Sequence, residues 1–217
     1  MKIDGLGAVV LCGGRSRRMG FPKHELWFDG KTFLQSVVER VSSVAQPVVV
    51  VVGHGERPPA ALPKNVQWLS DERADLGPLE GIRTGLASLS DHVSHAFVTS
   101  CDAPNLSPEL IRKLVDVLGQ HDAVVPRDGE RIYGMTAVYR TAVHQKIDGI
   151  YASGVSRRVS ALQAAVNACE VAVDDLRDVD PDLESFTNVN TADAYFDFLK
   201  RHGMTCPDKL AARLSNG

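Results

Sequence analysis

Apolar runs without polar interruption alternate with amphipathic segments along this chain. Residues 8–12 read Ala-Val-Val-Leu-Cys, and residues 48–52 are five consecutive valines. Unbroken apolarity is typical of strands that are covered on both faces, as in a parallel sheet. These two segments therefore predict central strands. Four shorter apolar segments predict further strands, at residues 66–69, 96–99, 123–126 and 135–139.

Segments with helical spacing lie between these strands. In the first of them Phe33, Val37 and Val41 recur every four positions, which predicts one buried helical face. Ser107 followed by Pro108 marks the start of another, because serine caps helix N-termini and proline suits the first turn. The predicted helices cover residues 32–45, 78–89, 108–118 and 192–201.

This alternation predicts a single α/β domain with a mostly parallel, Rossmann-like sheet flanked by helices. The chain has 217 residues and 44% hydrophobic content, which suits one well-buried domain. We assign the domain to residues 1–203. Residues 204–217 look polar and irregular, and we expect a flexible C-terminal tail there.

Composition excludes several classes of protein. The formal net charge of −3 lacks the basic excess of a general nucleic-acid binder, so any anion site must be local. The four cysteines form no C-x-x-C pair, which argues against zinc or redox motifs. Neither a signal peptide nor an apolar run of roughly 18 residues is present, so we expect a cytoplasmic protein without a membrane partner.

The first candidate for chemistry is the glycine- and arginine-rich loop that follows the first predicted strand. Gly13 and Gly14 allow backbone amides to approach a phosphate closely. The cations of this segment are Arg15, Arg17, Arg18 and Lys23. The strand exit favours a phosphate loop over a solvated basic turn, because ligands of open α/β sheets bind at the carboxyl ends of strands. The loop matches neither the Walker A nor the G-x-G-x-x-G pattern.

Two further candidates follow later strands. Asp71 stands just past a predicted strand and either accepts hydrogen bonds from a base or ribose or caps a turn. Gly77, Gly81 and Gly85 recur every four residues, which suits either a flat ligand or close helix–sheet packing. Asp102 stands at the exit of a buried strand, a position that suits a turn residue or, beside a phosphate loop, a Mg²⁺ ligand.

These segments, in this order, resemble the molybdenum cofactor guanylyltransferases, a family of nucleotidyltransferases with a GT-A-like fold. The stretch Cys12-Gly13-Gly14-Arg15-Ser16-Arg17-Arg18-Met19-Gly20-Phe21-Pro22-Lys23 is similar to the family's A-G-G-x-S-x-R-M-G-x-x-K, with cysteine in place of alanine. Gly77-Pro78-Leu79-Glu80-Gly81-Ile82 resembles its G-P-L-x-G-I, and Cys101-Asp102-Ala103-Pro104 resembles its C-D-x-P. Phe186-Thr187-Asn188-Val189-Asn190-Thr191 is similar to the F-x-N-x-N-T before its last helix, which Asn190 or Thr191 is placed to cap.

The resemblance implies a Mg²⁺-dependent transfer of GMP from GTP to the phosphate of molybdopterin, with release of pyrophosphate. Asp102 would bind Mg²⁺ and act in catalysis together with Arg18 and Lys23. The implied nucleotide-binding residues are Leu11, Cys12, Gly13, Gly14, Lys23, Asp71, Gly77 and Asp102. The implied partners are GTP and molybdopterin, with transient contacts to other molybdenum cofactor biosynthesis proteins or molybdoenzyme chaperones.

Three alternatives stay open at this stage. The enzyme could be a cytidylyltransferase of the same pterin or a sugar- or polyol-phosphate nucleotidyltransferase, because a few loop contacts select the base. A non-catalytic nucleotide-binding regulator on the same fold is the third. The chain departs from the family at Gly53-His54, where an asparagine is common, and at Tyr133-Gly134, where His-Pro is common.

Overall fold

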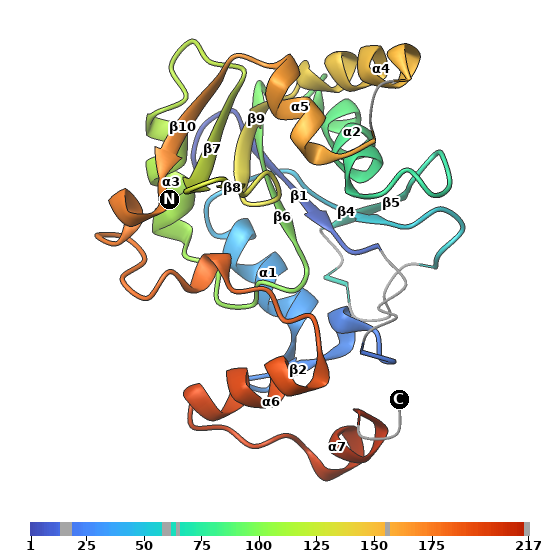
Figure 1. The fold of residues 1–217 in the computed structure, drawn as a ribbon, viewed down its shortest axis with the longest axis vertical. Helices are drawn as coiled ribbons and strands as arrows, with labels where there is room; N and C mark the ends of the chain where they lie inside the picture. The colour runs from blue at the N-terminus through green and yellow to red at the C-terminus, as the bar shows by residue number, and fades with distance from the viewer. Residues whose placement is uncertain (14–18, 58–61, 64–65, 155–156, 215–217) are drawn as a thin grey trace.

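The computed structural model describes residues 1–13, 19–57, 62–63, 66–154 and 157–214. Its main feature is a mixed, mostly parallel sheet in the order β10-β7-β9-β6-β1-β4-β5, with β8 paired to β7 (Figure 1). The strands of this sheet are β1 (Leu6–Leu11), β4 (Val48–Val52), β5 (Gln67–Ser70), β6 (His95–Ser100), β7 (Ala123–Asp128), β8 (Arg131–Ile132), β9 (Ala137–Arg140) and β10 (Ala168–Ala172). The predicted fold class, α/β with a mostly parallel sheet flanked by helices, is confirmed.

The two central strands are buried along their whole length, as continuous apolarity predicts. Every residue of β1 and β4 is buried, and the strands pair in parallel with Ala8 opposite Val48. Strand β6 pairs in parallel with the other side of β1. Strand β9 is antiparallel to both β6 and β7 and joins the two parallel parts of the sheet.

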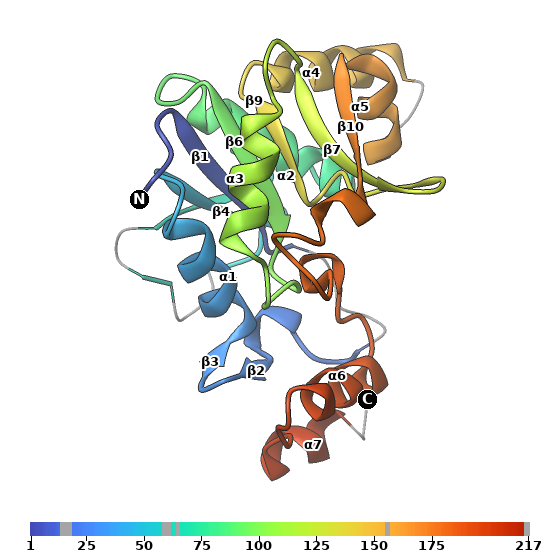
Figure 2. The ribbon, with the colours of Figure 1, turned by 90° about the vertical axis from the view of Figure 1, so that its left-hand side faces the viewer.

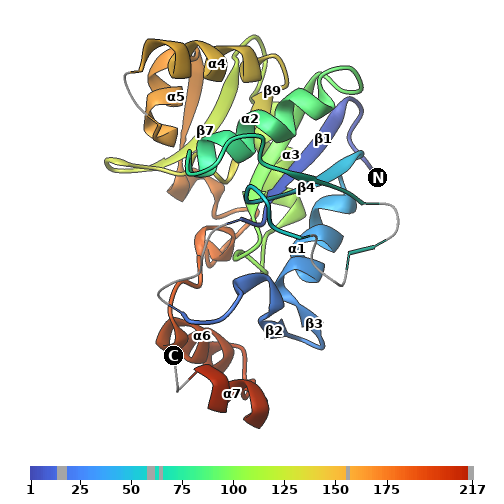
Figure 3. The same cartoon turned by 90° about the vertical axis from the view of Figure 1, so that its right-hand side faces the viewer.

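Helices cover both faces of the sheet. Helices α1 (Phe33–Ser42) and α3 (Pro108–Asp116) pack on one face, and α2 (Pro78–Leu89), α4 (Val143–Ser153) and α5 (Val159–Ala165) pack on the other (Figures 2 and 3). The caps follow their chemistry: the Thr32 and Gln35 side chains form a capping box on α1, and Ser107 caps α3. No helix within the described ranges is long and apolar enough to cross a membrane.

A third apolar cluster lies beyond the sheet and joins residues 19–33 to residues 189–214. The hairpin of β2 (Trp27–Phe28) and β3 (Lys31–Thr32) lies beside helix α6 (Ala192–Arg201), with α7 (Asp208–Leu214) next to it (Figure 1). Three short 3₁₀ turns complete the described fold: η1 (Lys23–Glu25), η2 (Val173–Leu176) and η3 (Glu184–Phe186).

The last described residues form a short helix, within the segment for which the sequence predicts a flexible tail. Residues 208–214 form α7, and Leu210 and Leu214 are buried in the third cluster. These leucines lie four residues apart on one helical face and belong to the same apolar cluster as side chains from residues 19–33. The polar composition of this segment gives no indication of these distant packing partners.

Candidate active site

The sheet register brings the chemically interesting residues to one edge. Leu11 of β1 lies opposite both Ser100 of β6 and Val51 of β4, and Val52 lies opposite Ser70 of β5. The residues that follow these four parallel strands therefore leave the sheet side by side. They include Gly13, Gly53, Asp71 and Asp102. In open α/β sheets this carboxyl edge is where ligands bind.

Gly13 allows a close approach between two strand exits. A Cβ at this position would lie 2.7 Å from the backbone nitrogen of Gly53, which is closer than real Cβ contacts. Before it, the Cys12 amide donates to the Val51 carbonyl over 2.7 Å. A glycine is therefore required where the first strand enters its loop. Gly14 and Arg18, which were also predicted to belong to the site, lie outside the described residues.

Lys23 and Asp102 meet at this edge although 79 residues separate them in sequence. The Lys23 ammonium lies 2.9 Å from Oδ2 of Asp102, and it also donates to Oδ1 of Asn190. The side chains of Lys23 and Asp102 are 22% and 11% exposed, so the pair is sheltered but open to a ligand. Two of the three residues predicted for catalysis thus form one cluster.

The Asp102 carboxylate is held from several sides. Ser100 donates to its Oδ1 while Lys23 occupies Oδ2, and the Asp102 carbonyl accepts from the Val189 amide over 3.3 Å. The last contact ties the turn after β6 to the segment before α6. Both carboxylate oxygens consequently have fixed directions, which favours the recognition of a cation or a polarised ligand.

Asn190 belongs to this cluster, and sequence reasoning considered it only as a helix cap. Thr191 is the residue that caps α6, by accepting from the Ala194 amide. The Asn190 side chain instead contacts Lys23. The repeated asparagine of the N-V-N-T segment was the sequence signal that could have found it.

The Asp71 carboxyl group has an oxygen that accepts no hydrogen bond. Its Oδ1 is buried and has no hydrogen-bond partner within the described part of the chain. Burial, reinforced by the nearby carboxylates of Glu80 and Glu56, raises the pKa of Asp71 to about 6. The ring nitrogen Nδ1 of His54 lies 2.9 Å from the Asp71 carbonyl oxygen, which anchors the backbone here. Since an orphaned buried acceptor is costly, Asp71 is suited to a ligand that brings an N–H or O–H group.

The three glycines at four-residue spacing divide into two roles. Gly77 has φ of +71° and precedes α2 as its N-cap, and a Cβ placed there would have nothing within 4 Å. A Cβ at Gly81 would lie 2.8 Å from Leu11, and one at Gly85 would lie 2.4 Å from Val9. Gly81 and Gly85 therefore serve close packing of α2 on β1, and Gly77 alone leaves open space at the helix start.

A charged network stabilises α2 next to Asp71. Glu80 is fully buried and pairs with Arg83 one turn later. Arg83 also contacts Glu72 and lies 3.8 Å from Asp148 of α4. A buried carboxylate without such a partner would be strongly destabilising, so this network is a structural support for the helix that borders the site.

Two thiols and an imidazole lie beneath the site. Cys12 and Cys101 are both buried, as expected for small core residues, and they follow paired positions of β1 and β6. Hydrogen bonding to Cys101, with a further contribution from His24, lowers the pKa of Cys12 to about 6. His24 has no obvious role in the sequence pattern, whereas the structure sets it against Cys12, and this contact raises its pKa.

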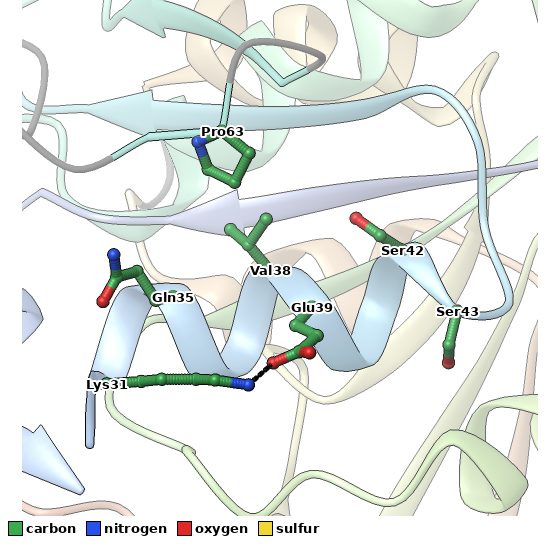
Figure 4. Close-up of a pocket in the computed structure, with 7 residues that line it drawn as sticks. All are labelled: Lys31, Gln35, Val38, Glu39, Ser42, Ser43 and Pro63. Carbon is green, nitrogen blue, oxygen red and sulfur yellow. Dashed lines mark hydrogen bonds and ion pairs between the residues drawn. The ribbon is translucent and has the colours of Figure 1, made fainter. Parts of the chain in front are cut away.

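The surface of the described structure carries two hollows that could hold a ligand. One, of about 480 Å³, lies along the outer face of α1 between Lys31 and Pro63 (Figure 4). It includes none of the residues at the carboxyl edge and is separate from the candidate site. The other, of about 710 Å³, lies between residues 187–189 and the face of α6 that carries Lys200 and Arg201.

The metal-binding capacity of the edge is limited. No group of three or more His, Cys, Asp or Glu side chains within the described ranges is arranged to hold a metal ion. A cation at Asp102 would therefore take most of its ligands from a substrate or from water. This donor set fits Mg²⁺, which favours one or two carboxylates together with phosphate oxygens.

A mostly parallel sheet with a glycine at the exit of its first strand and the Lys23–Asp102 pair at its carboxyl edge suits the binding of a phosphorylated ligand. Residues 8–169 match the model of the MobA-like NTP transferase domain, and the chain belongs to this family. It is 32% identical to a probable molybdenum cofactor guanylyltransferase of Methanosarcina mazei, over 86% of each chain. It is 38% identical to the probable molybdenum cofactor guanylyltransferase of Mycobacterium tuberculosis, over 86% of this chain and 90% of that one.

A solved structure shares the fold. The molybdopterin-guanine dinucleotide biosynthesis protein A of Archaeoglobus fulgidus aligns with a TM-score of 0.73 and 24% identity, covering 91% of this chain and 98% of that chain. The expected family and fold are confirmed, and the protein is a nucleotidyltransferase.

Proposed function

We propose that this enzyme transfers GMP from GTP to the terminal phosphate of molybdopterin and releases pyrophosphate. The observation that carries the proposal is the meeting of Lys23 and Asp102 at the carboxyl edge of the sheet. The names of the relatives, probable molybdenum cofactor guanylyltransferases, support the choice of GTP and of the molybdenum cofactor pathway.

The proposed reaction is an in-line displacement at phosphorus. An oxygen of the acceptor phosphate attacks the α-phosphorus of GTP, and the bond from that phosphorus to the bridging oxygen of pyrophosphate breaks. This step needs positioning and charge neutralisation more than covalent help from the protein. Lys23 supplies a positive charge 2.9 Å from the carboxylate that would share the site.

Different residues would bind the triphosphate and the metal ion. The backbone from Leu11 to Gly14 would cradle the triphosphate, with Arg18 adding charge; the roles of Gly14 and Arg18 rest on the family resemblance. Asp102 would hold Mg²⁺, which supplies neutralisation of phosphate charge when bound. On binding, Lys23 would exchange part of its contact with Asp102 for a phosphate oxygen.

The nucleoside would lie over Asp71 and Gly77. The unpartnered Oδ1 of Asp71 is an acceptor, and guanine offers two N–H donors on its Watson–Crick edge. The open space beside Gly77 at the start of α2 leaves room for the base or the ribose. Cytosine offers only its exocyclic amine as a donor on that edge, and this difference favours GTP over CTP.

We place the acceptor in the hollow between residues 187–189 and α6. Asn188 lines it, and Asn190, two residues on, contacts Lys23. Lys200 and Arg201 at the α6 side provide positive charge for an anionic acceptor, with Asp197 as the one acid of the lining.

A transfer assay tests the proposal. The protein, Mg²⁺ and GTP labelled at the α-phosphorus are incubated with molybdopterin, and label is followed into a pterin dinucleotide. We expect label transfer with GTP and little with CTP. Transfer from CTP alone would assign a cytidylyltransferase. Tight nucleotide binding without turnover on molybdopterin or a sugar phosphate would refute the proposed reaction.

A further inference from the structure

The apolar cluster around Lys23 joins the segment that follows the first strand to the C-terminal helices. Its members come from residues 19–33 and from residues 189–214. Those used below are Phe21, Leu26, Leu210 and Leu214. Lys23 stands between two of them, Phe21 and Leu26, which are 5% and 0% exposed. The turn that carries Lys23 is therefore anchored in this cluster on both sides.

The Lys23 turn is short and well fixed to these anchors. The Glu25 amide donates to the Pro22 carbonyl over 3.0 Å, and the Leu26 amide donates to the Lys23 carbonyl over 3.1 Å. Such a tight turn leaves little slack between Phe21 and Leu26. A shift of the Phe21 ring would consequently move the Lys23 backbone as well.

Helix α7 packs on the side of this cluster that contains Phe21. Leu210 and Leu214 lie on one helical face and are 7% and 4% exposed. The guanidinium carbon of Arg213 lies 4.8 Å from the centroid of the Phe21 ring, a cation–π distance. The helix lies beyond residues 8–169, which the family model matches.

We propose that α7 is a positioning element for Lys23. By packing on Phe21 it fixes the backbone that enters η1, and it thereby holds the Lys23 ammonium at Asp102 and Asn190. Lysine has a flexible four-carbon stem, so its charge is placed accurately only if the backbone beneath it is fixed. Misplacement of a positioning group by about 1 Å costs on the order of 100-fold in rate. The inference rests on the proposed function, because it assigns Lys23 a role at the triphosphate.

If α7 only shielded the apolar cluster from water, its loss would differ in effect from the loss of a positioning element. Loss of shielding would lower the stability of the whole protein and reduce activity by the same factor with or without Lys23. Loss of a positioning element acts through Lys23, so its effect disappears when Lys23 is absent. A double-mutant cycle separates the two roles.

The experiment compares Leu210→Ala/Leu214→Ala with the matched core variant Leu162→Ala, whose leucine is fully buried in the cluster of α2, α4 and α5. Pyrophosphate release from GTP, with molybdopterin and Mg²⁺ present, is measured in the wild-type and Lys23→Ala backgrounds. We expect the α7 variant to lose about 10- to 100-fold in the wild-type background and less than about twofold in Lys23→Ala. We expect Leu162→Ala to lose little in either background. Equal losses in both backgrounds, or full activity of the α7 variant, would overturn the proposal.

A second readout does not depend on activity. Amide hydrogen exchange of residues 19–26 is compared in the same variants. We expect exchange to be about tenfold faster in the α7 variant and unchanged in Leu162→Ala. If the α7 variant does not fold, Arg213→Ala, an exposed substitution, should show the same pattern on a smaller scale; unchanged exchange there would contradict the proposal. A wild-type protein that releases no pyrophosphate while α7 still protects residues 19–26 would refute the proposed function and leave the positioning contact intact.

Discussion

At the scale of single residues, the site depends on two aspartates with opposite surroundings. Asp102 has a partner on each oxygen, Ser100 and Lys23. Asp71 has a buried oxygen with no partner in the described structure and a pKa raised to about 6. A satisfied carboxylate beside a lysine suits cation and phosphate chemistry, whereas an unsatisfied one suits recognition of a donor. The two residues would therefore act on different parts of the nucleotide.

Asp102→Ala should remove catalysis without unfolding the protein. The substitution takes away the carboxylate proposed to hold Mg²⁺, and losing an electrostatic stabiliser of this kind costs on the order of 10²–10³ in rate. The measurement is Mg²⁺-dependent pyrophosphate release, with circular dichroism to check the fold. The matched control is Asp178→Ala, which breaks the exposed Lys113–Asp178 pair, has no contact with Lys23 or Asp102 in the described structure, and should retain full activity. Normal activity of Asp102→Ala would disprove the metal assignment.

Asp71→Asn should stabilise the protein in a pH-dependent way. The pKa of Asp71 in the folded protein, about 6, exceeds its ordinary value of 3.8, so the folded state binds more protons between these values. Stability contributed by this group is consequently lost as the pH rises from about 4 to 6 and stays lost above. Urea unfolding should show a larger gain for the variant at pH 7.5 than at pH 5. The same variant should bind GTP more weakly, and a stability gain independent of pH would refute the role assigned to the buried carboxylate.

At the scale of elements, four parallel strands and one helix place the site. Strands β1, β4, β5 and β6 end together, and α2 packs against β1 so closely that a Cβ at Gly85 would lie 2.4 Å from the side chain of Val9. Interiors are packed too densely to admit an extra methyl group without displacement. The spacing of glycines in α2 is therefore a consequence of packing first, and of ligand access only at Gly77.

Gly85→Ala should destabilise the protein although alanine is the better helix former. The new Cβ would lie 2.4 Å from Val9, and overpacking of this kind costs about 1–3 kcal/mol. Gly149→Ala is the matched control, because Gly149 lies within α4 with nothing inside 4 Å of its Cβ position. It should stabilise by about 0.5–1 kcal/mol. Thermal unfolding of the two variants checks both signs; equal effects would show that packing against Val9 is not what requires glycine.

Charge reversal in the proposed acceptor hollow should weaken binding of the acceptor alone. Lys200→Glu/Arg201→Glu reverses the charge on the α6 side, at the end of the helix that Thr191 caps. We expect the KM for molybdopterin to rise about tenfold while the affinity for GTP stays unchanged, because only the acceptor contacts that face. Steady-state kinetics with each substrate varied in turn separates the two. A matching loss of GTP affinity would remove the acceptor from this hollow.

Local sequence signals predicted the elements that define the site and missed those that depend on distant partners. The uninterrupted valines of β4, the cap at Ser107 and the helical face around Val37 each act within a few residues, and the structure confirms them. Helix α4 carries polar residues and an internal glycine, and α7 follows an irregular segment, so neither has a strong local pattern. Asn190 was missed as a site residue because its partner, Lys23, lies 167 positions away in sequence.

At the scale of the whole molecule, a sheet carries the site at one edge and a terminal cluster lies beneath it. The cluster joins residues 19–33 with helices α6 and α7, so segments far apart in the sequence support the same lysine (Figure 1). The sheet holds Asp71 and Asp102, and the cluster holds Lys23. The proposed reaction requires these two parts to converge on one triphosphate.

A crystal structure of the protein with GTP and Mg²⁺ would show whether they do. We expect the α- and β-phosphates between Lys23 and Asp102, with guanine against Asp71 at the start of α2. GTP bound elsewhere, or bound with its phosphates remote from both Lys23 and Asp102, would refute the proposed site.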